Sequence, residues 1–597
     1  MPFSDYVPEQ TFKERLNSAD GAATVANIKT PKLLTEPPMD PVVFSPYPEY
    51  TSYEYLKEFQ PVEKCYLDEE NRIAAPDVYA YPGLPQNMTD SYFGSNKLIG
   101  LTDKHCFDRF GRMSAYGYGY DKEQGGLGLA ANSENVGAEK ILDQMNKVDF
   151  RTVDWGKVQK QCYEKNKIRF DKDYVSPDGV KADPAKKFNY RSAYILRTWT
   201  GYEYTDFQLL ALRAMISELS VKSGGEYDIH FLVHVKDNTI PIWASDEVYR
   251  ETLEKHVPRE FWGLATLWSE KQMEMFYPGP FKDNVFNHAN APVHGAYRGL
   301  HLPLQWFAHK HPEYDYFWHW EMDMRFTGHY YELHEQAAAW AKQQPRKGMW
   351  ERAARYYIPR KHGSFEQFTE MVEEETLHSG EPPVWGPFEF ENSGMLKSPE
   401  SNIPKHTYTK DNFEWGVGEE ADLIVFNPLF KPDQTNWVFR DDVTGYNLSL
   451  PIPPRRVAII TVSRLSKSLL NTMHEETWRM RHHMFPEMWA PTVALHHGFK
   501  AVYVPHPVYF DRDWPLETLD TTFNHPVKPH DSPFGWGEHN QQGTSFYYNS
   551  GFSPALWRRW LGSRENNEGG HKEEAKGTGR MCLPPIMFHP IKHERAE

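Results

Sequence analysis

The sequence predicts an α/β domain with a mostly parallel sheet flanked by helices, an irregular amino-terminal arm and a carboxyl-terminal extension. Residues 192–196 are an apolar run fit for a buried strand, residues 205–219 have helical spacing, and residues 227–235 are a second apolar run. A strand, a helix and a strand in this order form a unit whose two strands are expected to be parallel. Aromatic residues make up 15% of the chain, so most of it is expected to bury a core.

Local signals set the bounds of these elements. Thr205 and Gln208 form a capping box at the start of the first helix, and Gly224 and Gly225 end it. Pro303 is expected to bend or shorten the helix that contains it. Further strands are predicted at residues 261–268, 314–321, 422–426, 457–462 and 501–504, and further helices at residues 245–254, 294–310, 330–342, 466–481 and 487–497. Ligands of such a sheet bind at the carboxyl ends of its strands.

The composition excludes several classes of protein. The 597 residues include 82 acidic and 66 basic side chains, and the formal charge of -16 argues against a nucleic-acid partner. No stretch approaches the ~18 apolar residues of a membrane helix, and the first ten residues lack the pattern of a signal peptide. The four cysteines include no Cys-x-x-Cys pair, which argues against a cysteine zinc site and leaves disulfides or buried thiols open.

Proline and glycine divide the chain into four parts. Residues 1–85 are rich in Pro and Tyr and are expected to form an extended arm or stem, or a disordered tail over the first 40 residues. Residues 86–188 are expected to form an irregular subdomain packed on the core, and their glycine-rich stretch is predicted to be a plain loop. Residues 189–520 are the α/β domain, and residues 521–597 are an extension that completes its site.

An acidic pair follows the aromatic strand at residues 314–321. Side chains alternate along a strand, so Glu321 and Asp323 are expected to share one face, with backbones roughly 7 Å apart. Both carboxylates can lean toward one ion, and paired carboxylates beside phosphate oxygens suit Mg²⁺ or Mn²⁺. The alternative is an ordinary strand end whose acids pair with Arg325.

The sequence resembles known families over most of its length. Residues 190–512 resemble a type-A (GT-A) glycosyltransferase, and residues 314–330 are similar to fungal Kre/Mnt-type α-mannosyltransferases. An uncharacterised fungal domain family is similar over residues 80–597; its motifs are read at residues 106–111, 383–387, 421–424, 505–509, 556–560 and 579–583. Members of that family commonly carry a membrane anchor, so the resemblance implies the Golgi or secretory lumen. The absent signal pattern leaves a cytoplasmic location open.

The resemblance implies a metal-dependent glycosyltransferase. Its donor would be a GDP- or UDP-linked sugar, with mannose as the first candidate, and its acceptor a hydroxyl of a glycan, glycoprotein or small molecule. Carried over to this chain, Glu321 and Asp323 become the Mn²⁺ (or Mg²⁺) and diphosphate pair. A late histidine often completes such a site; His589 is the first candidate and His506 the second.

The loops after the first two strands are expected to bind the nucleotide. Arg197 could pair with phosphate, and Trp199 or Tyr202 could stack on a base, with an ordinary core aromatic as the alternative for Trp199. Asp237 could bind a ribose or a base edge, and it could equally cap the following turn.

Glu487, together with Asp323, is the catalytic candidate. Glu487 lies near the start of the helix at 487–497, where type-A enzymes place an acid that faces the acceptor. It would orient or deprotonate an acceptor hydroxyl; the alternative is an acid that complements the helix dipole. The Thr-Asn-Phe-Glu element of the mannosyltransferases is replaced by residues 459–462, which leaves the nucleophile and the stereochemistry unassigned.

Two other functions stay open from sequence alone. A glycoside hydrolase also uses paired carboxylates, but needs neither metal nor nucleotide. A non-catalytic carbohydrate-binding relative would have lost the acidic pair, which this chain retains. The chain has no phosphate-binding Gly-x-x-x-x-Gly-Lys loop, Gly-x-Ser-x-Gly elbow or kinase motif set, so ATPase, serine hydrolase and kinase functions are excluded.

Overall fold

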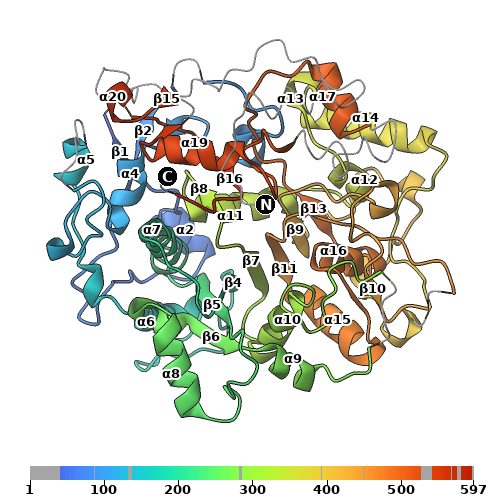
Figure 1. The fold of residues 1–597 in the computed structure, drawn as a ribbon, viewed down its shortest axis with the longest axis horizontal. Helices are drawn as coiled ribbons and strands as arrows, with labels where there is room; N and C mark the ends of the chain where they lie inside the picture. The colour runs from blue at the N-terminus through green and yellow to red at the C-terminus, as the bar shows by residue number, and fades with distance from the viewer. Residues whose placement is uncertain are drawn as a thin grey trace.

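The structure is a computed structural model that describes residues 40–85, 88–131, 138–281, 286–391, 393–447, 449–525, 541–565, 568–574 and 580–594. At its centre is a seven-stranded sheet with strand order β13-β9-β11-β7-β4-β5-β6 (Figure 1). The strands are β4 (Ser192–Trp199), β5 (Tyr227–His234), β6 (Ala265–Trp268), β7 (Tyr316–Trp320), β9 (Leu423–Val425), β11 (Ser463–Ser466) and β13 (Ala501–Tyr503). Only β11 runs antiparallel to its neighbours in this sheet, so the predicted α/β fold with a mostly parallel sheet is confirmed.

The strand order places a switch point between β4 and β7. From β4 the chain moves outward to β5 and β6, and it then returns to add β7 on the other side of β4. The two strands are parallel, with Leu196 opposite Trp320, so their carboxyl ends meet at one edge. The chain leaves β4 toward β5, on one side, and the sheet continues from β7 toward β11, on the other. This divergence opens a crevice between the ends of β4 and β7, where ligands of α/β sheets bind.

Helices cover both faces of the sheet. Trp318 of β7 packs on His334 of α11 (Tyr330–Lys342), whereas Phe317, which points to the opposite face, packs on Phe307 of α10 (His301–Lys310). Helix α7 (Asp206–Met215) lies on the α11 side; α15 (Lys467–Glu475) and α16 (Pro486–His496) lie on the α10 side (Figure 1).

Further helices and strands surround this core. The helices are α2 (Tyr53–Glu58), α3 (Asn96–Ile99), α4 (Arg109–Met113), α5 (Glu139–Leu142), α6 (Trp155–Asn166), α8 (Asp246–His256), α9 (Glu270–Phe276), α12 (Met349–Ala353), α13 (Pro359–His362), α14 (Phe365–His378), α17 (Leu516–Phe523), α19 (Phe552–Trp560) and α20 (His571–Glu573). The strands are β1 (Val42–Phe44), β2 (Val78–Pro82), β3 (His105–Cys106), β8 (Arg325–Phe326), β10 (Val443–Thr444), β12 (His483–Met484), β14 (Arg564–Glu565), β15 (Glu568–Gly569) and β16 (Met587–Phe588).

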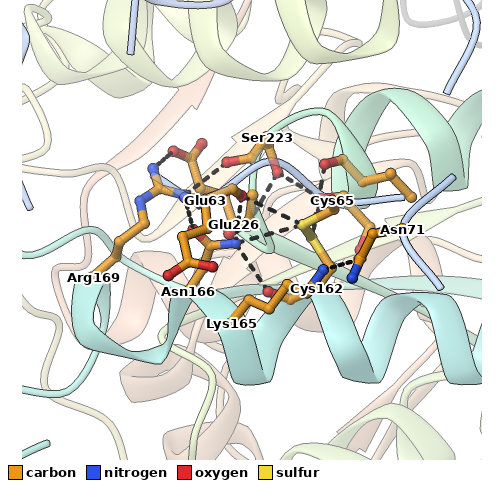
Figure 2. The surroundings of a disulfide bond; sticks show 12 residues. Glu63, Cys65, Asn71, Cys162, Lys165, Asn166, Arg169, Ser223 and Glu226 are labelled. Atoms are coloured by element: carbon orange, nitrogen blue, oxygen red, sulfur yellow. Dashed lines mark hydrogen bonds and ion pairs between the residues drawn. A yellow bond between two sulfur atoms is a disulfide. The ribbon is translucent and has the colours of Figure 1, made fainter. Parts of the chain in front are cut away.

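Two disulfides tie the ends of the chain to the core. Cys65 pairs with Cys162 of α6, and Cys106 of β3 pairs with Cys582, so all four cysteines are paired and buried. Figure 2 shows Asn166 beside the first disulfide, where its side chain exchanges hydrogen bonds with the backbone of Glu63. Of the alternatives that the sequence left open, the structure has two disulfides.

Three predicted elements differ from the structure. Residues 457–462 are not a strand: Val457 forms a single bridge to Phe430, and the ladder with β7 begins at Ser463. The apolar residues of this segment predicted a buried strand. They are buried, but they pack beside α16 and do not pair with a neighbouring strand of the central sheet. Residues 259–264 form a 3₁₀-helix ahead of β6. Helix α10 begins at His301, so Pro303 lies in its first turn, where a missing N–H costs nothing.

Within the described part of the chain, no helix combines the length and apolar character needed to cross a bilayer.

Candidate metal and ligand site

Three side chains from distant parts of the chain meet at the carboxyl edge of the sheet. Glu321 directly follows β7, Asp323 lies in the turn between β7 and β8, and His589 directly follows β16. Nε2 of His589 lies 3.1 Å from Oε2 of Glu321 and 3.4 Å from Oδ1 of Asp323. One ligand atom from each of the three residues lies within 4.8 Å of the others. The structure therefore brings together the acidic pair and the histidine that the sequence singled out.

Backbone pairing explains the position of His589. Strand β16 pairs antiparallel with β8, and the Ile591 N–H donates to the carbonyl of Asp323 over 2.8 Å. The imidazole Nδ1 lies 2.9 Å from the carbonyl of Tyr547, which leaves Nε2 facing the two carboxylates. Cys582 is seven residues upstream, so the disulfide to Cys106 anchors the segment that carries His589.

Glu321 is held from both neighbouring strands. A guanidinium nitrogen of Arg197, on β4, lies 2.9 Å from Oε1 of Glu321, and the hydroxyl of Thr461, just before β11, donates to the same oxygen. Burial opposes ionisation of Glu321, but the hydrogen bond from His589 and the charge of Arg197 outweigh it, so the pKa of Glu321 is lowered. Glu321 is therefore an ionised acceptor at neutral pH.

Asp323 and His589 form a tight ion pair. Burial opposes the charge on Asp323, but His589 and the ammonium of Lys592 lower the pKa of Asp323 well below its usual range. Burial likewise opposes the charge on His589, but Asp323 and Glu321 outweigh it and raise the pKa of the imidazole to about 10. A bound cation would take the place of the imidazole proton.

Glu487 lies in the first turn of α16 and is electrostatically coupled to this cluster. Burial raises the pKa of its carboxyl group well above the usual value, and the charge of Glu321 raises it further. Among the described residues, its side chain has no hydrogen bond or ion pair. The Glu487 carbonyl accepts the N–H of Ala458 over 3.0 Å, which fixes the backbone of this turn beside the segment that carries Thr461.

The loop after β4 presents aromatic side chains at the same edge. Trp199 remains 38% exposed, its ring centroid lies 4.7 Å from that of Tyr202, and the Lys236 ammonium lies 4.8 Å from the Trp199 ring. Tyr202 is half-buried, and burial raises the pKa of its hydroxyl. Trp199 is therefore not an ordinary core aromatic.

Two other candidates lie outside the cluster. The Asp237 carboxylate is exposed and accepts the N–H and the hydroxyl of Thr239 at 2.9 and 2.6 Å, so it caps the turn after β5. His506 is buried, with Nε2 3.1 Å from the carbonyl of Phe426, and it is not among the three clustered residues. Of the two histidines considered, the structure places only His589 beside the acids.

Sequence reasoning missed the residues that hold the cluster in place. Thr461 lies within the segment where the mannosyltransferase element was expected, but a lone hydroxyl carries no pattern. Lys592 is three residues after His589, and this spacing was the only available signal. Nothing in the sequence could indicate the carbonyl of Tyr547, because any residue supplies one.

The donor set fits a divalent cation. Two carboxylates and an imidazole are ligands that Mn²⁺ accepts readily, and carboxylates with water also suit Mg²⁺. A ligating histidine usually donates its second ring N–H to a carbonyl or carboxylate, as Nδ1 of His589 can do to Tyr547.

The fold and the site define an α/β protein with a candidate cation and anionic-ligand site at the switch point of its sheet. Residues 106–593 match the family described as "Protein of unknown function (DUF3405)", and since this match spans most of the chain, the protein belongs to that family. No curated protein and no solved structure matches the chain.

Proposed function

We propose that the protein is a metal-dependent glycosyltransferase that moves a sugar from a nucleotide sugar to a hydroxyl of a glycan, glycoprotein or small molecule. The observation that carries the proposal is the meeting of Glu321, Asp323 and His589 at the switch point between β4 and β7. A nucleotide is expected at this position in an α/β sheet, and the acids and histidine supply ligands for the cation that a diphosphate requires. The sequence resemblance to type-A glycosyltransferases supports the same class.

The charged residues around the cluster suit a diphosphate. A bound Mn²⁺ or Mg²⁺ would neutralise charge that develops on the departing nucleoside diphosphate. Arg197 and Lys592 each contact one of the two acids and are partly exposed, with side-chain exposures of 25% and 56%. Both can therefore turn to phosphate oxygens when a donor binds. Trp199 supplies an exposed ring on which a base can stack.

Glu487 is suited to act on the acceptor. A general base works best when its pKa lies near the working pH, and burial moves the pKa of Glu487 upward from the carboxylate range. The pKa values of Glu321 and Asp323 are lowered, so both carboxylates accept a proton poorly and are better suited to bind the cation. We therefore assign to Glu487 the orientation and deprotonation of the acceptor hydroxyl.

The two disulfides support a location in the secretory pathway. Disulfides persist in oxidising compartments and are rare in the cytosol. Both bridges are buried and join segments 97 and 476 residues apart, so they are part of the folded architecture. The Golgi or secretory lumen, implied by the resemblance, is therefore the proposed location.

Glycoside hydrolysis is the second candidate, and one observation favours it. The pKa of Glu487 is raised while that of its neighbour Glu321 is lowered. Carboxyl groups with opposite shifts are typical of the acid and the nucleophile of a glycosidase. A hydrolase would act without nucleotide or metal, and this difference separates the two functions.

Ligand-induced stabilisation tests the proposal. Thermal unfolding is followed with GDP, UDP and their common sugars, with and without Mn²⁺, for the wild type and Asp323→Asn. Glu251→Gln, an exposed acid on α8, is the matched control. A ligand at one hundred times its Kd stabilises the folded state by about 2.7 kcal/mol. We expect a manganese-dependent shift with one nucleotide in the wild type and the control, and its loss in Asp323→Asn.

Turnover of the stabilising donor then establishes the reaction. Release of the nucleoside diphosphate is measured with glycan and small-molecule acceptors in the presence of Mn²⁺. If no nucleotide binds with metal, and an aryl glycoside is cleaved without either, the protein is a hydrolase and the transferase proposal is wrong.

A further inference from the structure

An exposed tyrosine lies beside Glu487, the residue assigned to the acceptor. Tyr297 is in the loop before α10, and its side chain is 61% exposed. Its ring centroid lies 5.5 Å from that of Phe485, which is two residues before Glu487 in the chain. Partial burial and the nearby carboxylate of Glu487 raise the pKa of the Tyr297 hydroxyl. The exposed ring and the acid are therefore neighbours.

The loop that carries Tyr297 reaches the face of the sheet on which Glu321 lies. His301, the first residue of α10, has its ring centroid 5.8 Å from that of His319. Because side chains alternate along a strand, His319 of β7 and Glu321 point to the same face. Tyr297 is four residues before His301, so the loop ends beside the acidic cluster.

Glu487 is linked to the same cluster from the other side. Its carbonyl accepts the N–H of Ala458, and Thr461, three residues after Ala458, donates its hydroxyl to Glu321. Three residues span at most roughly 11 Å. Tyr297 and Glu487 are therefore both placed on the α10 side of the cluster, where an acceptor would approach a donor bound to it.

The backbone on both sides of Tyr297 is fixed. The N–H of Ala296 donates to a carboxylate oxygen of Glu270, in the first turn of α9, over 2.8 Å. The side chain of Arg298 is buried, with Nε 2.9 Å from Oδ1 of Asp442. Breaking a buried ion pair is strongly destabilising, so the loop is firmly held. The Tyr297 ring is thereby presented to solvent in a defined position, which lowers the entropy cost of packing a ligand on it.

Two further aromatic rings support Tyr297. The rings of Phe485 and Phe439 contact it in edge-to-face arrangements, with centroids 5.5 and 6.2 Å away. Phe439 and Phe485 stack on each other with centroids 3.7 Å apart, so the two supporting rings form one rigid unit. The part of the Tyr297 ring that this unit does not cover is an apolar surface next to Glu487.

An open aromatic ring beside a carboxyl group suits a sugar. The C–H groups on one face of a pyranose can pack on an aromatic ring while a hydroxyl at its edge bonds to the acid. The serine or threonine hydroxyl of a peptide has no such flat face beside it. We propose that the acceptor is a glycan whose sugar ring packs on Tyr297 and presents a hydroxyl to Glu487. This inference rests on the proposed function, since it names the acceptor of the proposed transfer.

Tyr297 would act by holding the acceptor. In the transfer, the hydroxyl oxygen bonds to the anomeric carbon of the donor sugar, and the bond from this carbon to the nucleoside diphosphate breaks. The diphosphate leaves with the bonding electrons, and Glu487 takes the hydroxyl proton. Tyr297 makes and breaks no bond in these steps, but it keeps the hydroxyl beside Glu487. Loss of its ring should therefore raise the KM for the glycan more than it lowers kcat.

The test compares Tyr297→Ala and Tyr297→Phe with the wild type. Saturation-transfer NMR measures binding of mannose, glucose and galactose disaccharides to the full chain with Mn²⁺ and GDP or UDP, and kinetics give the KM of the best acceptor. We expect Tyr297→Ala to weaken disaccharide binding and to raise this KM by about tenfold, and Tyr297→Phe, which keeps the ring, to retain most of the binding. Manganese-dependent nucleotide binding reports that each variant is folded.

Tyr190→Ala is the matched control, because Tyr190 is 55% exposed and precedes β4 at the opposite edge of the sheet. It should bind disaccharides as the wild type does. The proposal is overturned if no disaccharide binds to the cooperatively folded wild type, if Tyr297→Ala binds as tightly as Tyr190→Ala, or if a serine or threonine peptide accepts the sugar and no glycan does.

Failure of the acceptor site and failure of the proposed function give different results. Donor turnover with an unchanged glycan KM in Tyr297→Ala would leave the transferase standing and refute the role of Tyr297. Disaccharide binding that is lost in Tyr297→Ala, in a protein that turns over no donor, would support the sugar site at Tyr297 and count against the transferase alone.

Discussion

The disulfide between Cys106 and Cys582 should control the site, and the disulfide between Cys65 and Cys162 should not. The first anchors the segment in which the Leu583 N–H donates to Phe107 and the Ile591 N–H donates to Asp323, over 3.0 and 2.8 Å. The second joins α6 to the segment near Cys65, and no residue of the cluster lies in either. Each pair of cysteines is therefore replaced by alanine in a separate variant. Both variants should lose stability, but only the Cys106/Cys582 variant should also release the segment that holds His589.

The length of the loop that each disulfide closes sets how much free energy of unfolding it contributes. In the chain-entropy model, the 476-residue separation of Cys106 and Cys582 corresponds to at most about 6 kcal/mol, and the 97-residue separation of the other pair to about 4.7 kcal/mol. Measured values are commonly 2–4 kcal/mol, so the two variants should lose similar free energy of unfolding. Only the Cys106/Cys582 variant should also expose the Ile591 amide to hydrogen exchange and weaken Mn²⁺ binding.

Denaturant unfolding, amide exchange of residues 583–591 and manganese titration measure these three quantities on the same samples. The reasoning fails if both variants lose manganese binding equally, or if removal of Cys106 and Cys582 leaves the Ile591 amide as protected as in the wild type. The first outcome would mean that manganese binding follows overall stability, and the second that β16 itself, and not the disulfide, anchors His589.

Three further predictions concern single side chains. Glu487→Gln should lower kcat for transfer and leave nucleotide binding unchanged; a rise in the Kd of the nucleotide instead would place Glu487 at the donor. Lys592→Met should weaken binding of a nucleoside diphosphate and spare that of Mn²⁺ alone, as calorimetry would show; equal binding of the diphosphate would remove Lys592 from the donor site. Burial raises the pKa of Glu332 from 4.5 to about 7, so its stabilising contribution is complete below pH 4.5 and is lost as the pH rises through 7. Between pH 4.5 and 8 the wild type should therefore lose about 3 kcal/mol of unfolding free energy that Glu332→Gln keeps, because glutamine does not ionise. Urea unfolding over this pH range measures the difference. Parallel pH profiles for the two proteins would contradict the prediction.

The sequence predicted the parallel sheet and the acidic pair because both follow from local pattern. Apolar runs and helical spacing repeat along residues 190–504, and Glu321 and Asp323 follow an aromatic run that was predicted to be a strand and is β7 in the structure. The prediction of a strand at 457–462 was wrong because a buried segment has the same apolar pattern whether or not it pairs with a neighbouring strand. Its apolar residues pack in the core, and the pairing of β11 with β7 starts one residue later, at Ser463.

The partners of the cluster could not be predicted, because they depend on long-range pairing. His589 was found through a resemblance, and only the register of β16 against β8 explains why it meets Asp323. The pairing of the cysteines was undetermined, since four cysteines permit three connectivities.

The position of the site explains why the chain needs its carboxyl-terminal extension. The sheet alone provides Glu321, Arg197 and Thr461. The guanidinium of Arg197 and the hydroxyl of Thr461 hold the ionised carboxylate of Glu321 in place. Asp323 lies just beyond β7, and within the described structure its carboxylate forms ion pairs with His589 and Lys592 of the extension. Without that segment, two carboxylates would stand side by side with a single guanidinium to offset them, and their repulsion would favour one protonated acid. The extension therefore completes the cluster chemically, because it adds the imidazole and the ammonium that keep both acids ionised and available to a cation.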